Sequence, residues 1–253
     1  MFEGVHDKIP DITAYLARLG IDGIPQPTKE NLDRLIYAHY THIPYENLMT
    51  LYEKKCPDLT ISGLFDKIIT KKRGGYCFEM NGLFYALLRD LGYDVYPVAC
   101  RMWIGLGELP LGHEASIVTL DGKKYYVDVG TSGMVGYKSL GFDEVSDNGS
   151  YIKFNGDNAE IYKKGEDGDE LIISFADHYF NPIDFVPLNF YVAYGPASTD
   201  NPVIMVNLTT KTGAYSINGN VFKIHDNGEV TETLIENDEM FLDILKKYFG
   251  IVL

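Results

Sequence analysis

The amino-acid sequence predicts an α+β fold, in which helices come first, antiparallel strands follow and a mixed segment ends the chain. Apolar residues recur at helical spacing up to residue 92, and they then alternate in short runs that are typical of strands. A last helix follows several further strands. Because helices and strands are segregated along the chain, a doubly wound α/β fold is not expected. The three segments are 1–92, 93–190 and 191–253.

The first segment is predicted to hold four helices. Two of them begin after the capping residues Asp11 and Thr28, and each cap is followed by apolar residues at helical spacing. A third helix is predicted over 62–70. The fourth starts near Cys77 and ends at Gly92. These short helices predict a helical unit at the start of the chain.

The second segment is predicted to be β-rich and antiparallel. Its strands are 94–104, 113–120, 125–130 and 170–175, and DGKK at 121–124 is a hairpin turn between two of them. The stretch 143–169 is polar and rich in Gly and Asp, which predicts a long turn region. The last segment is predicted to hold strands over 203–208, 214–218 and 221–225 and a helix over 237–249. That helix starts acidic and ends basic, which suits the helix dipole.

Composition and charge exclude several classes of function. The 253 residues are 45% hydrophobic, enough for a sizeable core, and the net charge of -14 disfavours nucleic acid and anionic membranes as partners. No apolar run is long enough to span a bilayer, and the N-terminus lacks the pattern of a signal peptide. Cys56, Cys77 and Cys100 fit neither a disulfide framework nor a zinc site, so no metal and a reducing cytoplasm are expected. Cys56 and Cys100 are interpreted as structural residues.

Cys77 has a special setting in the segment RGGYCFEMNGLF. It stands at the predicted start of the fourth helix, directly after two glycines and a tyrosine. A helix N-terminus favours the thiolate form of a cysteine, and Lys71, Lys72 and Arg73 are expected to add positive charge nearby. Most free cysteines are simply small buried residues. The sequence around Cys77 provides the conditions for a nucleophile, but taken alone it favours a structural cysteine.

Two further residues complete a catalytic pattern. His113 opens a strand after a glycine-rich loop, and Asp128 stands between two valines in an otherwise apolar strand. A buried carboxylate needs a partner because burying a lone charge is costly. The hairpin turn at 121–124 would bring Asp128 to His113. Cys77, His113 and Asp128 then follow the Cys–His–acid logic of nucleophilic catalysis.

The segment RGGYCFEMNGLFYALLRDLGYDV resembles the signature of the arylamine N-acetyltransferases. In that family an Arg-Gly-Gly-x-Cys stretch opens a helix, an Asn follows the Cys by four residues, the catalytic His heads a later strand and the Asp lies in a Val-Asp-x-Gly turn. The order and spacing of Cys77, His113 and Asp128 are similar to this pattern. IPYENL, DFVPLNFYVAYGPAS and KKYFGI resemble further family segments, so the resemblance spans nearly the whole chain.

The resemblance implies a fold and a reaction. The fold is an N-terminal helical bundle (1–92), a central antiparallel β-barrel (93–190) and a C-terminal α/β lid (191–253) around a cysteine-proteinase-like Cys-His-Asp core. The reaction is a ping-pong transfer, in which acetyl-CoA acetylates Cys77 and a small arylamine or hydrazine then takes the acetyl group. Acetyl-CoA is a co-substrate, and no bound cofactor is expected.

The resemblance also implies roles for individual residues. His113 is the base for Cys77, and Asp128 holds the imidazole. The implied supporting residues are Arg73, Glu46 and Asn81, with Arg73 paired to Glu46 to brace the Cys loop. The implied substrate-binding residues are Tyr45, Gly130 and Thr131.

One departure from the family keeps alternatives open. Thr131 stands where the family commonly has a Phe beside the aromatic acceptor, which removes a stacking surface. An amide synthase of the same fold, with another acyl donor, is therefore an alternative. The triad alone also allows a Cys-His-Asp hydrolase, and a non-catalytic binding protein is the least expected reading. The acidic chain could hold polyanionic CoA only through local cations, for which the candidates are Lys71, Lys72, Lys211 and Lys223.

Overall fold

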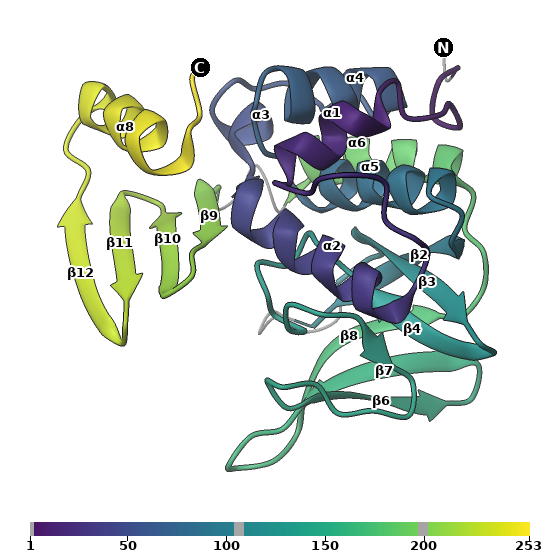
Figure 1. The fold of residues 1–253 in the computed structure, drawn as a ribbon. Coiled ribbons are helices and arrows are strands. Elements are labelled where there is room, and N and C mark those ends of the chain that lie inside the picture. Colours follow the sequence, from purple (N-terminus) through teal and green to yellow (C-terminus); the bar gives the residue numbers. More distant parts are fainter. Residues whose placement is uncertain (1–2, 104–108, 197–201) are drawn as a thin grey trace.

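The computed structural model describes residues 3–103, 109–196 and 202–253, and it contains two antiparallel sheets with helices packed against them (Figure 1). The last residue of the predicted strand 94–104, the glycine-rich part of the loop before His113 and the end of DFVPLNFYVAYGPAS lie outside the described residues. The α+β class is confirmed, with a nearly closed barrel as its central sheet.

The predicted helices of the first segment are present. They are α1 (Ile12–Arg18), α2 (Lys29–His42), α4 (Ile61–Phe65) with a π-helical turn (Asp66–Thr70), and α5 (Cys77–Asp90). The side chain of Asp11 accepts a hydrogen bond from the Ala14 N–H, and that of Thr28 accepts one from the Asn31 N–H. A short helix, α3 (Leu48–Leu51), was not predicted.

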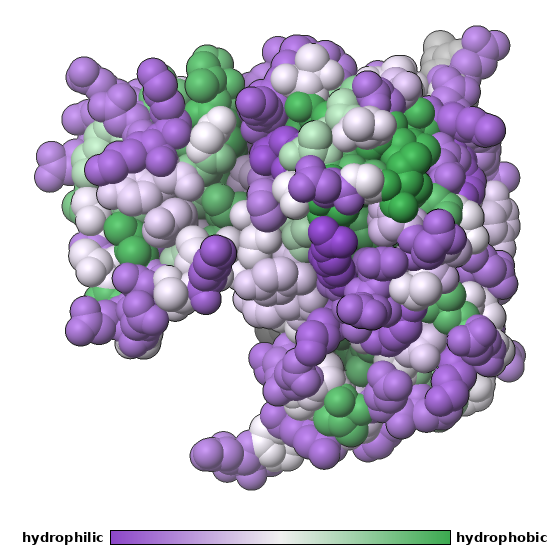
Figure 2. Space-filling view, viewed as in Figure 1, coloured by the Kyte–Doolittle hydropathy of each residue, from purple (hydrophilic) through white to green (hydrophobic). Residues whose placement is uncertain are grey.

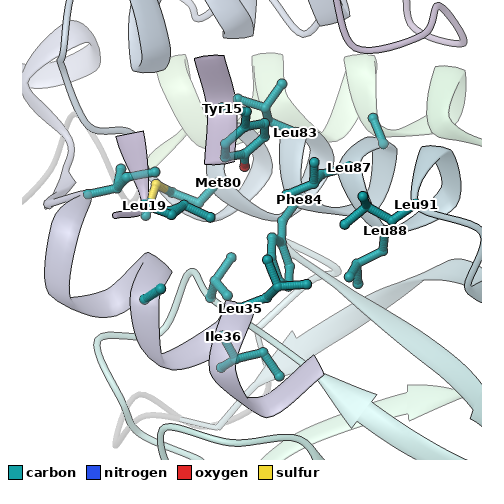
Figure 3. Close-up of a cluster of buried hydrophobic side chains, with 14 of the residues drawn as sticks. Tyr15, Leu19, Leu35, Ile36, Met80, Leu83, Phe84, Leu87, Leu88 and Leu91 are labelled. Carbon is teal, nitrogen blue, oxygen red and sulfur yellow. The ribbon is translucent and has the colours of Figure 1, made fainter. Parts of the chain in front are cut away.

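The helices share one apolar core. Figure 3 shows that side chains from α1, α2 and α5 point into a single cluster, and α5 contributes the largest share of the labelled residues. Val118, Val127 and Val129 of the barrel pack against the same cluster. The helix that begins with Cys77 is therefore fixed between the other helices and the barrel.

The central sheet winds almost into a barrel. Its order is β5-β4-β3-β2-β8-β7-β6, formed by β2 (Asp94–Met102), β3 (His113–Leu120), β4 (Lys123–Val127), β5 (Leu140–Gly141), β6 (Ser150–Asn155), β7 (Asn158–Lys163) and β8 (Glu170–Ala176). A bridge between Val145 and Tyr151 joins the segment after β5 to β6, which brings the two edges together. The predicted hairpin between β3 and β4 is confirmed, because Asp121 and Gly122 both adopt the left-handed conformation that a tight two-residue turn requires.

Two predictions in the barrel are wrong. The stretch 143–169 is not one long turn, because it contains the β6–β7 hairpin. Polar residues on the outer faces of β6 and β7 hide the alternation of buried residues such as Ile152 and Ile161. Strand β4 ends at Val127 instead of 130, where Asp128 leaves the ladder to make side-chain hydrogen bonds.

The second sheet combines a short strand of the first segment with the strands of the last segment. Its order is β1-β9-β10-β11-β12, formed by β1 (Tyr45–Glu46), β9 (Met205–Thr209), β10 (Gly213–Asn218), β11 (Val221–Asp226) and β12 (Glu229–Leu234). Helix α8 (Asp238–Ile244), continued by a π-helical turn (Leu245–Phe249), packs on it as predicted for the end of the chain. β1, β12 and helix α6 (Phe185–Tyr194) were not predicted. Figure 1 shows this sheet beside the helices, apart from the barrel.

Candidate active site

Cys77, His113 and Asp128 come together where α5 meets the barrel. Cys77 is the first residue of α5, His113 is the first residue of β3, and Asp128 directly follows β4. All three are buried, with exposed fractions of 8%, 2% and 6%. The Cys77 Sγ lies 3.7 Å from the Gly112 carbonyl oxygen, so the thiol faces the start of β3. The three residue types predicted from the sequence thus lie in one site.

His113 and Asp128 form a buried pair. The His113 Nε2 lies 2.7 Å from the Asp128 Oδ2, and the nitrogen donates because a carboxylate can only accept. Burial alone would lower the pKa of His113, but the Asp128 carboxylate and the Cys77 thiol raise it to about 10. Burial opposes ionisation of Asp128 too, yet His113 and further hydrogen bonds hold the pKa of Asp128 below its usual value. The pair is therefore an imidazolium and a carboxylate at neutral pH.

Asp128 is surrounded by donors. Its Oδ1 accepts hydrogen bonds from the Asn81 side-chain amide at 3.0 Å and the Gly130 N–H at 2.8 Å. Its Oδ2 accepts a further bond from the Tyr126 hydroxyl at 2.9 Å. Tyr40 of α2 donates to the Asp128 carbonyl oxygen at 2.8 Å. Sequence reasoning missed both tyrosines, although Tyr126 and Asp128 are two residues apart and the strand period places them on one face.

Asn81 ties the nucleophile helix to the two barrel strands. Its amide nitrogen also donates to the Glu114 carbonyl oxygen at 2.6 Å, and its oxygen accepts from the Val129 N–H at 2.8 Å. Gly130 leaves room for this contact, since a Cβ added there would lie 2.7 Å from the Cys77 Cα and 2.8 Å from the Asn81 Nδ2. The resemblance implied Asn81 and Gly130 as site residues, and the structure places both next to Asp128, with Gly130 also against Cys77.

Arg73 and Glu46 lie together below the Cys77 turn. The Arg73 Nε and Nη2 both donate to the Glu46 Oε1, at 3.0 and 2.8 Å, and Nη1 donates to Glu53 at 2.9 Å. The pairing that the resemblance implied is present, and both donors converge on one carboxylate oxygen. The other Glu46 oxygen accepts from the Leu48 N–H. Glu46 is thus fixed at both oxygens.

Lys67 and Glu79 extend this charged network, and sequence reasoning missed them. The Lys67 Nζ lies 2.7 Å from the Glu79 Oε1 and 3.4 Å from the Glu46 Oε1, and all three side chains are buried. The second Glu79 oxygen accepts from the Tyr76 N–H, which caps α5 directly before Cys77. The position of Lys67 on the apolar side of the segment 62–70 was the available signal, because a lysine there needs a buried partner.

The positive charge expected around Cys77 is largely compensated by carboxylates. Lys71 forms an exposed ion pair with Asp66 at 2.6 Å, and Lys72 is exposed. Arg73 is paired with two glutamates. The charged group that interacts directly with the Cys77 thiol is therefore His113.

Tyr45 lies near Cys77, and Thr131 lies near Asp128 through Tyr40. Tyr45 is half-buried in the apolar cluster that contains Cys77 and Phe185, and burial followed by the nearby Cys77 raises its pKa, which keeps its phenol neutral. Thr131 is half-buried, and its Oγ1 lies 3.3 Å from the Tyr40 hydroxyl.

A groove of about 490 Å³ opens beside the site, between α2 and the second sheet. Tyr37 of α2, Tyr137, Lys211 and His225 are among its lining residues, and the Tyr137 ring packs edge-on against Tyr40. Figure 2 shows that the molecule is hollowed between the second sheet and the barrel. Of the other lysines considered for CoA, Lys223 is paired with Glu232 at 2.6 Å.

The other cysteines are free thiols outside the triad. Cys100 is buried on β2 opposite His113, and Cys56 accepts a hydrogen bond from the Asn189 amide at 3.2 Å. Among the residues that the structure describes, no group of three or more His, Cys, Asp or Glu side chains is placed to hold a metal ion. No helix in the described ranges is both long and apolar enough to cross a bilayer.

Comparisons with known proteins agree with this geometry. A sequence model of the N-acetyltransferase family matches residues 28–253. The chain is 28% identical to the arylamine N-acetyltransferase of Mycolicibacterium smegmatis, over 95% of this chain and 92% of the relative, and 29% identical to that of Mycobacterium tuberculosis, over 95% and 89%. The solved structure of the Mycobacterium marinum arylamine N-acetyltransferase in complex with CoA superposes with a TM-score of 0.83 at 28% identity, over 95% of this chain and 93% of that chain. The chain therefore belongs to the arylamine N-acetyltransferase family.

Proposed function

We propose that this protein transfers an acetyl group from acetyl-CoA to a small arylamine or hydrazine through an acetyl thioester on Cys77. The observation that carries the proposal is the placement of His113, with Asp128 at 2.7 Å on one side and the Cys77 thiol as a second partner. Family membership and the CoA complex of the related structure support acetyl-CoA as the donor.

The proposed first half-reaction acylates the enzyme. The Cys77 thiolate attacks the thioester carbonyl carbon, and the carbonyl oxygen becomes an oxyanion. The Cys77 N–H lies in the first turn of α5, where backbone N–H groups have no acceptor within the helix, so it is available to that oxyanion. The bond to the CoA sulfur then breaks, and the His113 imidazolium donates a proton to the leaving thiolate.

The proposed second half-reaction releases the product. The amine nitrogen attacks the acetyl-Cys77 carbonyl, neutral His113 takes the proton that the nitrogen loses, and Cys77 leaves as a thiolate. Asp128 stays ionised throughout and holds the imidazole orientation. Because CoA leaves before the amine reacts, the kinetics are ping-pong.

The supporting residues act through position. Arg73 and Glu46 hold the turn before Cys77, and Asn81 holds Asp128 against α5. Tyr45, Gly130 and Thr131 form the acceptor side. The groove lined by Lys211 and His225 is the proposed entry of the CoA donor, because Tyr137 links it to the site through Tyr40 and because Lys211 supplies a cation for the phosphates.

Thr131 favours one alternative within the same chemistry. Its hydroxyl lies near the Tyr40 hydroxyl and offers no aromatic face, so an acceptor or acyl chain without an aromatic ring fits this side equally well. An amide synthase with a longer acyl thioester is therefore the second candidate. A Cys-His-Asp hydrolase would use the same triad with water as the acceptor.

A cytoplasmic location is part of the proposal. The three cysteines are free thiols, and a reducing compartment keeps a thiol nucleophile active. Cell fractionation with an antibody against the protein tests this, and recovery outside the cytoplasmic fraction would contradict it.

The decisive experiment is intact-protein mass spectrometry after incubation with acetyl-CoA and no amine. We expect a gain of one acetyl group on Cys77, discharged by an arylamine or a hydrazine. Cys77→Ser should stay folded and form no adduct that an amine discharges, whereas the matched control Cys56→Ser, at another free thiol, should behave as the wild type. Acetylation only with longer thioesters would favour the amide synthase, and product release without an amine would favour the hydrolase.

A further inference from the structure

The barrel strand that precedes Asp128 supplies a second donor to the oxygen that His113 uses. Tyr126 and Asp128 project from one face of the chain, and the Tyr126 hydroxyl donates to the Asp128 Oδ2 at 2.9 Å. The His113 Nε2 lies 2.7 Å from the same oxygen. The two remaining side-chain and backbone donors, Asn81 and Gly130, are bound to Oδ1. Of these four donors, Tyr126 is the one that shares the oxygen with the imidazole.

The position of Tyr126 is fixed on every side. The residue is 1% exposed, and its backbone lies between Ile117 of β3 and Leu140 of β5. Its ring packs against Phe175 of β8, with ring centroids 5.3 Å apart. A hydroxyl held this rigidly at a carboxylate oxygen keeps its direction when the charge on the imidazole changes.

We propose that Tyr126 is a positioning residue of the acyl transfer, whose hydroxyl shares the Asp128 Oδ2 with His113 and so limits how strongly the carboxylate holds the imidazolium. This inference rests on the proposed function. A hydrogen bond to a carboxylate oxygen disperses its charge, which weakens its attraction for a second donor at the same atom. A less tightly held imidazolium gives up its proton more readily to the leaving CoA thiolate.

Several titratable groups surround this arrangement. The Tyr126 hydroxyl also interacts with the Cys100 thiol of β2. Burial and then the Asp128 charge raise the pKa of Tyr126 well above its usual value, so the phenol remains a donor throughout the working range. The titratable side chains that face Asp128, Tyr126 or His113 from the packed elements include Tyr40 of α2, Tyr45 of β1, Cys77 of α5, Cys100 of β2, and His113 and Glu114 of β3.

The test compares two changes of opposite sign at one position. In Tyr126→Phe the Asp128 Oδ2 keeps His113 as its donor and loses the phenol. The alkaline limb in the pH profile of the acylation rate should then move up by about one pH unit, and the rate near neutral pH should fall about tenfold. A fluorinated tyrosine incorporated at position 126 is a stronger donor of the same shape, and it should move the limb down. The measured quantity is the rate of acetyl-Cys77 formation from acetyl-CoA, followed by rapid quenching and intact mass.

The neighbouring Tyr125 provides the matched control. It is buried, it alternates to the other face of β4, and its ring lies under the Lys29 ammonium, so Tyr125→Phe should leave the limb in place. Opposite shifts for Phe and fluorotyrosine support the inference, because loss of packing alone cannot produce them. Coincident profiles for wild type, Tyr126→Phe and fluorotyrosine would overturn it. If Tyr126→Phe does not fold, the fluorotyrosine variant decides alone. A wild-type protein that forms no acetyl-Cys77 would instead contradict the proposed function.

Discussion

The His113 Nε2 and the Asp128 Oδ2 are 2.7 Å apart in a part of the molecule from which solvent is almost completely excluded. Burial disfavours both charges, yet each charge stabilises the other, and the result is a His113 pKa of about 10. The site therefore keeps a protonated imidazole beside Cys77 across the neutral range, where an ordinary histidine is largely neutral. This is the form that protonates a leaving thiolate.

Replacing the carboxylate should remove this property. In Asp128→Asn the burial of His113 is no longer opposed by a charge, so its pKa should fall from about 10 to below the ordinary value of 6.5. In the pH profile of acetyl-Cys77 formation, the alkaline limb should move to lower pH together with the His113 pKa. The rate at neutral pH should fall by about 10²–10⁴-fold. The pH dependence of the acylation rate measures both effects. As a control, Asp177→Asn removes a carboxylate that pairs with Lys124 elsewhere on the barrel, and an equal shift in that variant would contradict the assignment.

Gly130 should not tolerate any side chain. Its added Cβ would meet the Cys77 Cα at 2.7 Å, and a backbone atom of a packed helix cannot move aside cheaply. Gly130→Ala should lower the free energy of unfolding by about 1–3 kcal/mol and should strongly reduce acylation. Gly82→Ala is the control on the same helix as Cys77, because its added Cβ would lie 3.6 Å from the nearest atom, the Glu114 Oε2, which is an ordinary contact. Urea unfolding and the acylation rate check the pair, and equal stability of the two variants would count against the steric argument.

Arg73 should be needed for stability far more than its exposed neighbour. Arg73→Ala leaves Glu46 buried with Lys67 as its remaining cation, and removing one partner of a buried ion pair costs about 3–5 kcal/mol. Lys71→Ala breaks only an exposed pair with Asp66 and should change the free energy of unfolding by less than about 1 kcal/mol. Denaturant titration of both variants measures the difference. Similar losses of unfolding free energy in Arg73→Ala and Lys71→Ala would show that the buried network does not stabilise the fold.

Glu114 should make the stability of the protein depend on pH. Its side chain is 2% exposed and faces a cavity of about 20 Å³ lined by apolar residues such as Phe78 and Phe185. Burial raises the pKa of Glu114 well above its ordinary value, with His113 opposing and Asp128 adding to the effect. Above the unfolded pKa the unfolded chain releases this proton while the folded protein retains it, so stability falls as pH rises, by about 1.4 kcal/mol per pH unit, until the folded pKa is reached.

Glu114→Gln should therefore be more stable than the wild type at neutral pH and should lose the slope. Urea unfolding at several pH values between the unfolded pKa and neutrality measures it. Glu232→Gln, at an exposed carboxylate of β12, is the matched control and should leave the slope unchanged. Parallel stability curves for Glu114→Gln and the wild type would contradict a neutral buried Glu114.

Residues whose roles are local could be predicted from the sequence, and residues whose roles depend on distant contacts could not. The caps Asp11 and Thr28 act on the next turn of their own helices, so the local pattern of residues identified them. Cys77, His113 and Asp128 stand out because each is an unusual residue at the end of a regular element. Lys67 was missed because its partner Glu79 lies on another helix, and an isolated lysine in a sequence is usually exposed.

Strand pairing explains the remaining misses. The β6–β7 hairpin is stabilised by pairing with β8, and half of its strand residues are polar, so neither strand alone shows a clear pattern. Strand β1 is only two residues long and exists because β9 pairs with it. The Tyr126 hydroxyl was overlooked because its neighbours in the sequence suggested an ordinary apolar strand, although its spacing from Asp128 contained the information.

Strand β1 has a consequence for synthesis of the protein. Tyr45 pairs with Asn207, the Asn47 side chain bonds to the backbone of Val203 and Met205, and the Glu46 N–H bonds to the Gly75 carbonyl oxygen in the turn before Cys77. Strand β1, which holds the turn before Cys77, is therefore paired only once β9 has been synthesised. During translation the contacts that hold the turn before Cys77 are incomplete until β9 has left the ribosome. A chain truncated before β9 would lack the strand that pairs with Glu46.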